Sequence, residues 1–180
     1  LLVTLDTTRA DRLGCYGYAA GRTGTIDALA RGGVLFEYCI APAPITLPSH
    51  ATLLTGLQPY SHGARSNGTH YLPAEVATLA ERLSSEGFAA GAVVSAFVLD
   101  SRFGLDQGFD RYDDDLSHGK GDAVSGFRET RAADTLRRAR LWLEERGDER
   151  WFLWVHLFDP HSDYAAPEPW RTEFASSPYD

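Results

Sequence analysis

The chain has 180 residues, of which 43% are hydrophobic and 23% charged, a composition typical of a globular domain rather than of a disordered, collagenous or coiled-coil chain. Lys and Arg number 17 against 25 Asp and Glu, and the net charge of −8 disfavours nonspecific binding to nucleic acids or anionic membranes. No apolar run reaches the roughly 18 residues that a membrane-spanning helix needs, so no membrane contact is expected from this segment. Cys15 and Cys39 have neither metal-binding nor disulfide-framework spacing.

Apolar runs with β-branched or aromatic residues predict strands, and apolar residues at helical spacing predict helices between them. In chain order, the expected strands are residues 1–5, 34–36, 88–95 and 151–157. Helices are expected around residues 26–30, from about 73 to 87, and through 132–143. Residues 100–130, rich in Asp and Gly, are expected to form a long surface connection. This alternation predicts an α/β fold with a mostly parallel sheet flanked by helices on both faces.

The two ends of the sequence bear on domain organisation. Residue 1 is not Met and residues 1–5 already fit a buried strand, so any signal peptide or membrane anchor would lie upstream. Residues 176–180 provide no helix or strand that would close a sheet. We therefore interpret residues 1–180 as the N-terminal part of a larger domain. A periplasmic, extracellular or membrane-anchored location would each be consistent with an upstream signal or anchor.

Asp6 is the first candidate functional residue. It directly follows a strand that has no other charge, and ligands of parallel sheets bind outside the carboxyl ends of the strands. A hard divalent cation can use a carboxylate at such a place. The alternative is that Asp6 caps the following turn or pairs with Arg9.

Residues 41–56 contain the second candidate. Pro48 at a first helical turn and Gly56 at its end predict a short helix whose N-terminus lies beside Thr46 and Ser49. Unpaired amides and the helix dipole there attract phosphate or sulfate, and a hydroxyl held beside a metal can attack such a group. Thr46 is thus a candidate nucleophile. The alternative is that Thr46 or Ser49 only caps the helix.

Four segments, in this order, together resemble the sulfatase family of the alkaline phosphatase superfamily. They are LDTTRADRLGCYGY at 5–18, TIDALARGGVLFEYCIA at 25–41, TLPSHATLLTGLQPYSHG at 46–63 and FLWVHLFDPHSDY at 152–164. The resemblance runs from Leu2 to about Pro167, and residues 46–63 are its most specific part. It implies a fold of the alkaline phosphatase type, of which residues 1–180 would be the N-terminal portion of the catalytic domain.

The resemblance also implies a metal-dependent ester hydrolase or group transferase in which Asp6 and Thr46 both contact the metal. One or two divalent ions are expected, and Ca²⁺, Mn²⁺, Mg²⁺ and Zn²⁺ all remain candidates. The family completes its metal site with an Asp and a His or Asn from much later in the chain, so the remaining ligands are expected beyond residue 180. The segment alone is therefore expected to bind metal poorly and to have little activity.

Departures from the family pattern indicate the substrate. Sulfatases have a CxPSR or SxPSR core whose first residue becomes formylglycine, whereas residues 46–50 are TLPSH, so no formylglycine is expected. A hydrated aldehyde expels its sulfate by collapsing to the carbonyl, and a threonine sulfate has no such exit. A cation can activate a threonine hydroxyl for in-line attack on phosphorus, as threonine nucleophiles do in superfamily relatives that cleave phosphodiesters or transfer phospho-alcohol groups. A phosphate or phosphonate ester or a phosphodiester is therefore the expected substrate.

Five further residues take roles from the resemblance. Thr7 stands where many sulfatases have a second metal-binding acid, which weakens the case for calcium. His50 replaces the Arg of the core and either bonds the attacking oxygen or bound anion, or only satisfies the helix start. His161 resembles the family's His that touches the anion or protonates the leaving group, the alternative being a core or turn histidine. Arg9 and Asp11 fit the DxxRxD opening and are expected to brace the loop by pairing.

His156 and Ser95 are expected to have lesser roles, and two alternative functions stay open. His156 lies within the last expected strand and is interpreted as structural. Ser95 stands in a region where many sulfatases carry a Lys and a His, so that half of the anion pocket is absent or rebuilt.

One alternative function is a sulfuric ester hydrolase that works without formylglycine. The other is a non-catalytic protein that holds an anionic group in the pocket. The expected partner is a small-molecule, lipid or glycan ester and no nucleic acid.

Overall fold

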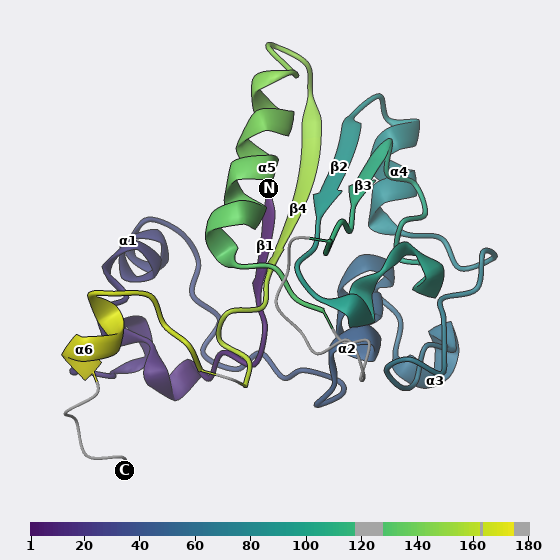
Figure 1. The fold of residues 1–180 in the computed structure, drawn as a ribbon. Helices are drawn as coiled ribbons and strands as arrows, with labels where there is room; N and C mark the ends of the chain where they lie inside the picture. The colour runs from purple at the N-terminus through teal and green to yellow at the C-terminus, as the bar shows by residue number, and fades with distance from the viewer. Residues whose placement is uncertain (118–127, 163, 175–180) are drawn as a thin grey trace.

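The computed structural model describes residues 1–117, 128–162 and 164–174, and these contain a parallel four-stranded sheet in the order β1-β4-β2-β3 (Figure 1). The strands are β1 (Leu2–Leu5), β2 (Ala89–Val93), β3 (Arg111–Asp113) and β4 (Trp151–Leu157). β4 lies between β1 and β2, although it comes last in the chain. The carboxyl ends of β1, β4 and β2 therefore meet at one edge of the sheet, where parallel sheets bind their ligands.

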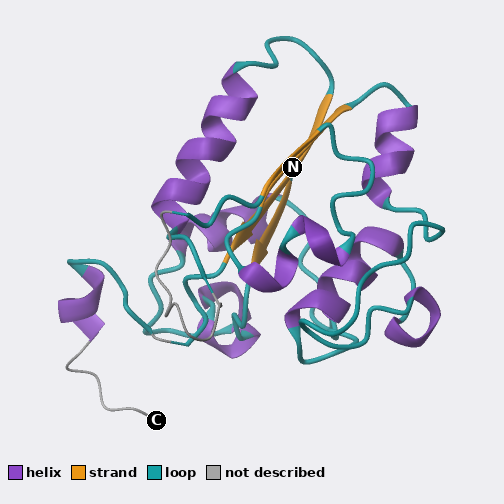
Figure 2. Cartoon of the chain, turned by 45° about the vertical axis from the view of Figure 1, so that its right-hand side comes forward, coloured by secondary structure: helices purple, strands orange, loops and turns teal. Residues whose placement is uncertain are grey.

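Helices lie on both faces of the sheet, which Figure 2 shows nearly edge-on. The described helices are α1 (Gly24–Gly32), α2 (Thr46–Thr55), α3 (Pro59–His62), α4 (Leu79–Ser85), α5 (Ala132–Glu144) and α6 (Trp170–Phe174), the last of which lies away from the sheet (Figure 1). Short 3-10 turns are formed by Ala10–Arg12, Gly14–Tyr16, Phe97–Leu99 and Ser101–Phe103. Among the described residues, no helix combines the length and apolar character needed to cross a membrane.

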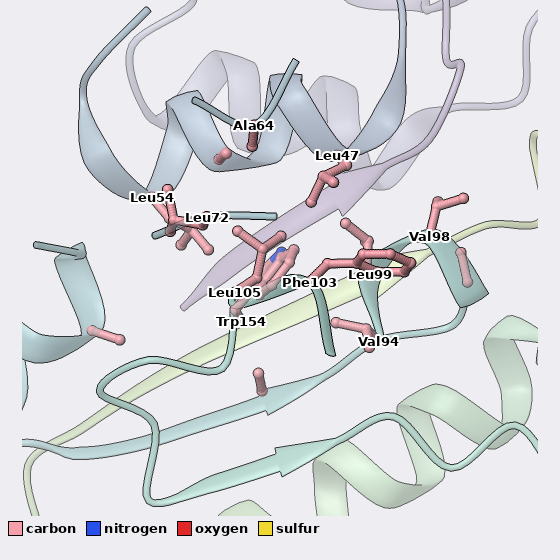
Figure 3. Packing of buried hydrophobic residues seen from close by; sticks show 14 of the residues in the cluster. Leu47, Leu54, Ala64, Leu72, Val94, Val98, Leu99, Phe103, Leu105 and Trp154 are labelled. Atoms are coloured by element: carbon pink, nitrogen blue, oxygen red, sulfur yellow. The ribbon is translucent and has the colours of Figure 1, made fainter. Parts of the chain in front are cut away.

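Two hydrophobic cores sandwich the sheet because successive residues of a strand point to opposite faces. On one face, Ala92 and Trp154 join a large cluster to which α2 contributes Leu47 (Figure 3). On the other face, Val155 packs with Trp142 of α5 in a smaller cluster. The expected α/β class, with helices on both faces of a parallel sheet, is confirmed.

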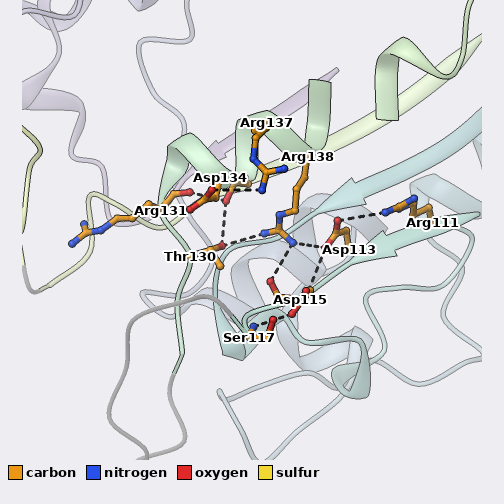
Figure 4. A network of polar contacts seen from close by, with 10 residues as sticks. Arg111, Asp113, Asp115, Ser117, Thr130, Arg131, Asp134, Arg137 and Arg138 are labelled. Atoms are coloured by element: carbon orange, nitrogen blue, oxygen red, sulfur yellow. Dashed lines mark hydrogen bonds and ion pairs between the residues drawn. The ribbon is translucent and has the colours of Figure 1, made fainter. Parts of the chain in front are cut away.

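A largely buried ion pair fastens α5 to the edge strand β3 (Figure 4). The side chains of Arg138 and Asp113 are only 15% and 11% exposed and are paired with each other. Arg138 also donates hydrogen bonds to the carbonyl oxygen of Asp115 and to Oγ1 of Thr130. Charges with so little access to water require such partners, and the network fixes the end of a strand only three residues long.

The structure confirms three expected strands and corrects two predictions. Residues 34–36 are not a strand: they form no ladder with any described residue, and the side chains of Val34 and Phe36 are 81% and 67% exposed. Their β propensity reflects side-chain shape and supplies no hydrogen-bonding partner. β3 was missed because Arg111–Asp113 is short and carries charge at both ends. It lies in the segment expected to be a surface connection, of which residues 118–127 are outside the described residues.

The helical predictions around 26–30 and 132–143 are confirmed by α1 and α5, whereas the start near Pro73 is wrong. α4 begins at Leu79, where Thr78 and Glu81 form a capping box. Oγ1 of Thr78 accepts a hydrogen bond from the Glu81 amide at 3.1 Å, and the Glu81 carboxylate accepts one from the Thr78 amide at 2.7 Å. This reciprocal cap sets the helix start more strongly than the fixed φ of a proline does.

Candidate functional site

A cleft of about 450 Å³ lies where the carboxyl end of β1 meets the N-terminal end of α2. Its lining includes Asp6, Thr7, Thr46, His50, Asn67 and His161. Four residues expected to contact the metal or the substrate, Asp6, Thr46, His50 and His161, are thus brought to one place from three separate parts of the chain. The roles assigned to them stay predictions.

Asp6 and Thr46 are in direct contact. The hydroxyl of Thr46 donates a hydrogen bond to Oδ2 of Asp6 at 3.0 Å, and both residues are buried, at 7% and 9% exposure. Asp6 is fixed to the sheet because its amide donates to the Leu157 carbonyl at 3.0 Å, which extends the pairing of β1 with β4 beyond the strand end. The hydroxyl and the carboxylate therefore converge at the edge of the sheet, as the sequence predicts.

The helix that carries Thr46 runs from Thr46 to Thr55 and ends at Gly56 with φ +72°, as predicted. Its N-terminal amides, however, are largely occupied. The amide of Leu47 donates to Oδ1 of Asn67 at 2.8 Å, the amide of Ser49 donates to the Ile45 carbonyl at 3.3 Å, and Pro48 has no N–H. The expectation of unpaired amides at this end is wrong for Leu47, because Asn67 caps its amide from a later loop.

His156 is part of the site although it lies within β4. Its Nε2 is 3.2 Å from Oδ2 of Asp6, and its Nδ1 is 3.3 Å from Oγ of Ser95. His156, interpreted from the sequence as structural, thus contacts a candidate site residue, and its neighbour Ser95 stands where many sulfatases carry a Lys and a His. Both residues are fully buried. A histidine between Val155 and Leu157 in an otherwise apolar strand is the sequence signal that marks it.

The buried carboxylate is ionised in this environment. Burial by itself raises the pKa of Asp6, but the hydrogen bonds from His156 and Thr46 outweigh it and leave the pKa below its usual value. For His156 burial dominates and lowers the pKa, with the hydrogen bond to Asp6 opposing it. The pair is therefore a carboxylate beside a neutral imidazole at neutral pH, and the carboxylate is in the form that binds cations.

His50 serves the start of α2. Its Nδ1 lies 2.8 Å from the Thr46 carbonyl oxygen, so Nδ1 carries the proton and donates it, because a carbonyl can only accept. Burial and the nearby His156 lower the pKa of His50 to about 4, which keeps the ring neutral. Of the two roles considered for His50, satisfying the helix start is the contact observed, and the ring also lines the cleft.

His161 and Thr7 belong to the loops beside the cleft. The His161 ring stacks on Phe158 with centroids 4.2 Å apart, and its Nδ1 is 3.1 Å from Oγ of Ser162. Thr7 has φ +50°, which is unusual for a β-branched residue and costs on the order of 1–3 kcal/mol. Its hydroxyl donates to the Pro160 carbonyl at 3.0 Å and so ties the loop after β1 to the loop after β4.

The expected pairing of Arg9 with Asp11 is confirmed. Nε and Nη2 of Arg9 donate to the two carboxylate oxygens of Asp11 at 2.9 and 2.5 Å. The hydrogen bonds from Arg9 lower the pKa of Asp11. Both side chains are largely exposed, so this bidentate pair shapes the loop after β1 rather than contributing much to stability.

The residues present fit part of a divalent cation site. Asp6 offers a carboxylate oxygen and Thr46 a hydroxyl oxygen, the ligand types that hard cations prefer. Within the described ranges, no group of three or more His, Cys, Asp or Glu side chains is arranged to hold a metal ion. The described residues therefore provide a portion of the ligands such an ion requires.

The sequence profile of the sulfatase family matches residues 1–180, the whole of the chain. The chain belongs to the sulfatase family. It is 36% identical over 103 residues to the steryl-sulfatase of Rattus norvegicus and 36% identical over 98 residues to the arylsulfatase A of Homo sapiens. These alignments cover 52% and 51% of this chain but only 18% and 19% of the relatives, so the chain spans about a fifth of their length.

Solved structures show the same fold. A protein in complex with its substrate D-glucosamine-2-N,6-O-disulfate superposes with a TM-score of 0.80 at 20% identity, over 99% of this chain and 38% of that one. The phosphonate monoester hydrolase of Agrobacterium radiobacter superposes with a TM-score of 0.75 at 24% identity, over 99% and 44%. The predicted alkaline phosphatase-like architecture is confirmed, and the chain corresponds to less than half of either structure.

Proposed function

We propose that this chain is the N-terminal part of the catalytic domain of a metal-dependent hydrolase or group transferase that cleaves a phosphate or phosphonate ester or a phosphodiester with Thr46 as nucleophile. The observation that supports it is the 3.0 Å hydrogen bond from the Thr46 hydroxyl to Oδ2 of Asp6 at the mouth of the cleft. In the proposal, further ligands beyond residue 180 complete the cation site that Asp6 and Thr46 begin.

The contacts of Thr46 suit an attacking group. Its hydroxyl proton points to Asp6, so the oxygen lone pairs are left for the electrophile. A bound divalent cation would lower the pKa of the hydroxyl and neutralise the nonbridging oxygens of the ester. His50 and Asn67 hold the first turn of α2 through the Thr46 carbonyl and the Leu47 amide, which fixes the direction from which Thr46 attacks.

The reaction we propose has two displacements at phosphorus. In the first, Thr46 passes its proton to the Asp6 carboxylate and forms a bond to phosphorus while the bond to the leaving-group oxygen breaks. His161, which lines the same cleft, donates a proton to that oxygen. In the second, water or an acceptor alcohol passes a proton to His161, bonds to phosphorus and displaces Thr46, whose oxygen regains its proton from Asp6.

Sulfate esters are a second candidate substrate because the curated relatives at 36% identity are sulfatases. Threonine, however, lacks the aldehyde chemistry by which formylglycine releases sulfate, so a sulfated Thr46 would need direct attack of water at sulfur. This chemical difference makes phosphorus the favoured centre.

A comparison of aryl substrates tests the proposal. The catalytic domain containing this chain is assayed with Mn²⁺ and an aryl phosphodiester, an aryl phosphonate and an aryl sulfate that share one leaving group. We expect the highest kcat/KM for a phosphorus ester and its loss in Thr46→Ala. A preference for the aryl sulfate would favour the second candidate, and binding of the probes without turnover would favour a non-catalytic anion-binding protein.

A further inference from the structure

Four side chains form a continuous row of contacts across the carboxyl edge of the sheet. Ser95 follows β2, His156 belongs to β4, Asp6 follows β1, and Thr46 begins α2. Neighbouring side chains in the row are 3.3, 3.2 and 3.0 Å apart, from Ser95 Oγ to His156 Nδ1, from His156 Nε2 to Asp6 Oδ2, and from Thr46 Oγ1 to Asp6 Oδ2. Because β2, β4 and β1 are neighbours in the sheet, the first three residues have fixed backbone positions.

The chemistry of these groups sets the direction of the hydrogen bonds. An ionised carboxylate can only accept, so Nε2 of His156 carries the ring proton and donates it to Asp6. On its other edge Nδ1 lies 3.3 Å from Oγ of Ser95, whose one hydroxyl proton is donated to the His156 carbonyl at 2.6 Å. The ring is thus held by its hydrogen bond to Asp6, while Ser95 holds the backbone of the same residue. His50 packs against the ring edge-on with centroids 4.9 Å apart.

We propose that His156 is a positioning residue that holds Asp6 in the one orientation that receives the Thr46 hydroxyl. This inference rests on the proposed function, because the orientation matters only if Asp6 serves the cation and the nucleophile. Oδ2 accepts from both His156 and Thr46, so the carboxylate cannot rotate away from either donor without losing a hydrogen bond. Ser95 supports His156 in turn, as outer residues do for metal ligands.

An apolar side chain would fill the same space without this effect. His156 is fully buried between the apolar residues Val155 and Leu157 of β4 and packs beside Trp154 and Phe158. A residue that only fills the core can therefore be replaced by Phe. A residue that positions Asp6 can be replaced only by a side chain that donates an N–H, and this difference separates the two roles.

The test measures the Asp6 side chain by NMR in the 180-residue chain and needs no catalytic activity. The variants are His156→Phe, which keeps a ring, His156→Gln, which keeps an N–H donor, and Ser95→Ala; exposed His70→Gln is the control. We expect a single Asp6 rotamer and an Nε2-protonated His156 in the unsubstituted chain. His156→Phe should populate at least a second Asp6 rotamer, and His156→Gln should restore the single one.

A single Asp6 rotamer in folded His156→Phe would overturn the proposal. If that variant does not fold, Ser95→Ala decides, because it leaves the Asp6 environment otherwise intact. A second Asp6 rotamer or a second His156 tautomer in Ser95→Ala supports the positioning role, and unchanged signals of both residues contradict it. These results do not depend on turnover. The positioning role of His156 can therefore be refuted while the proposed reaction is supported, and the proposed reaction can be refuted while the positioning role is supported.

Discussion

At the scale of single residues, the site combines a buried charge with two buried neutral histidines. Asp6 is stabilised as the carboxylate by donors from His156 and Thr46. His50 and His156 are kept neutral by burial. These ionisation states favour a site that binds a cation through its carboxylate and offers no positive charge of its own from the imidazoles.

The buried histidines predict how stability depends on pH. The pKa of His50 is about 4 in the folded protein and 6.5 as its ordinary value, so between these values the unfolded chain binds more protons. The contribution of the neutral His50 ring to the free energy of unfolding is fully present above pH 6.5 and is lost as the pH falls toward 4. We expect urea unfolding to show lower stability at pH 5 than at pH 7, and a smaller difference in His50→Gln.

The exposed His70 provides the control for this prediction. His70→Gln makes the same replacement of an imidazole by an amide at an exposed position outside the cleft. A difference that is as large in His50→Gln as in the unsubstituted chain would show that His50 does not cause the pH dependence.

The sequence predicted the residues at strand and helix ends but missed those that act from elsewhere. Asp6 and Thr46 could be placed because each sits where an apolar strand or a helix pattern begins or stops. His156 and Asn67 could not, since their roles depend on which strands are neighbours and on a contact between residues 20 positions apart. Spacing along the chain does not encode such pairings.

At the scale of elements, α2 depends on a cap from outside the helix. Ile45 at its N-cap position provides no side-chain hydrogen bond, and Asn67 supplies the missing acceptor to the Leu47 amide. We expect Asn67→Ala to lower the free energy of unfolding by about 1 kcal/mol, the usual effect of losing a helix cap. Urea unfolding measures this change.

Asn67→Asp is the matched variant because it keeps an oxygen acceptor at the same position. Its negative charge at a helix N-terminus is favourable, so it should retain most of the stability that Asn67→Ala loses. Equal losses in both variants would mean that Asn67 acts through something other than the hydrogen bond to Leu47.

The strands show where sequence patterns suffice for an element and where they do not. The runs that became β1, β2 and β4 are apolar and continuous, and the sheet buries them on both faces, so pattern and structure agree. Residues 34–36 have the same residue types but no partner strand among the described residues. Strand formation needs that partner, and its presence is a property of the whole fold rather than of the segment.

At the scale of the whole molecule, one region exposes an unusual amount of apolar surface. Five large apolar side chains in α1 and the segment that follows it are between 67% and 91% exposed: Leu29, Val34, Phe36, Tyr38 and Ile40. The related structures are more than twice as long as the part this chain matches. We propose that the remainder of the catalytic domain covers this surface and adds the missing metal ligands.

This proposal predicts a difference in metal binding. Affinity for a hard cation rises with the number of oxygen ligands, and this chain supplies two, from Asp6 and Thr46. In calorimetry with Mn²⁺, the 180-residue chain should bind at least about ten-fold more weakly than a protein that contains the complete catalytic domain. Equal affinity of the two proteins would place the whole metal site within residues 1–180.

The central claim, that Thr46 attacks phosphorus, is tested most directly by trapping the covalent intermediate. The catalytic domain is incubated with Mn²⁺ and an aryl phosphodiester, quenched with acid and digested, and the peptide carrying residues 46–50 is examined by mass spectrometry. The account predicts a phosphoryl ester on Thr46 and neither adduct nor turnover in Thr46→Ala. Turnover by Thr46→Ala, or an adduct on another residue, would contradict it.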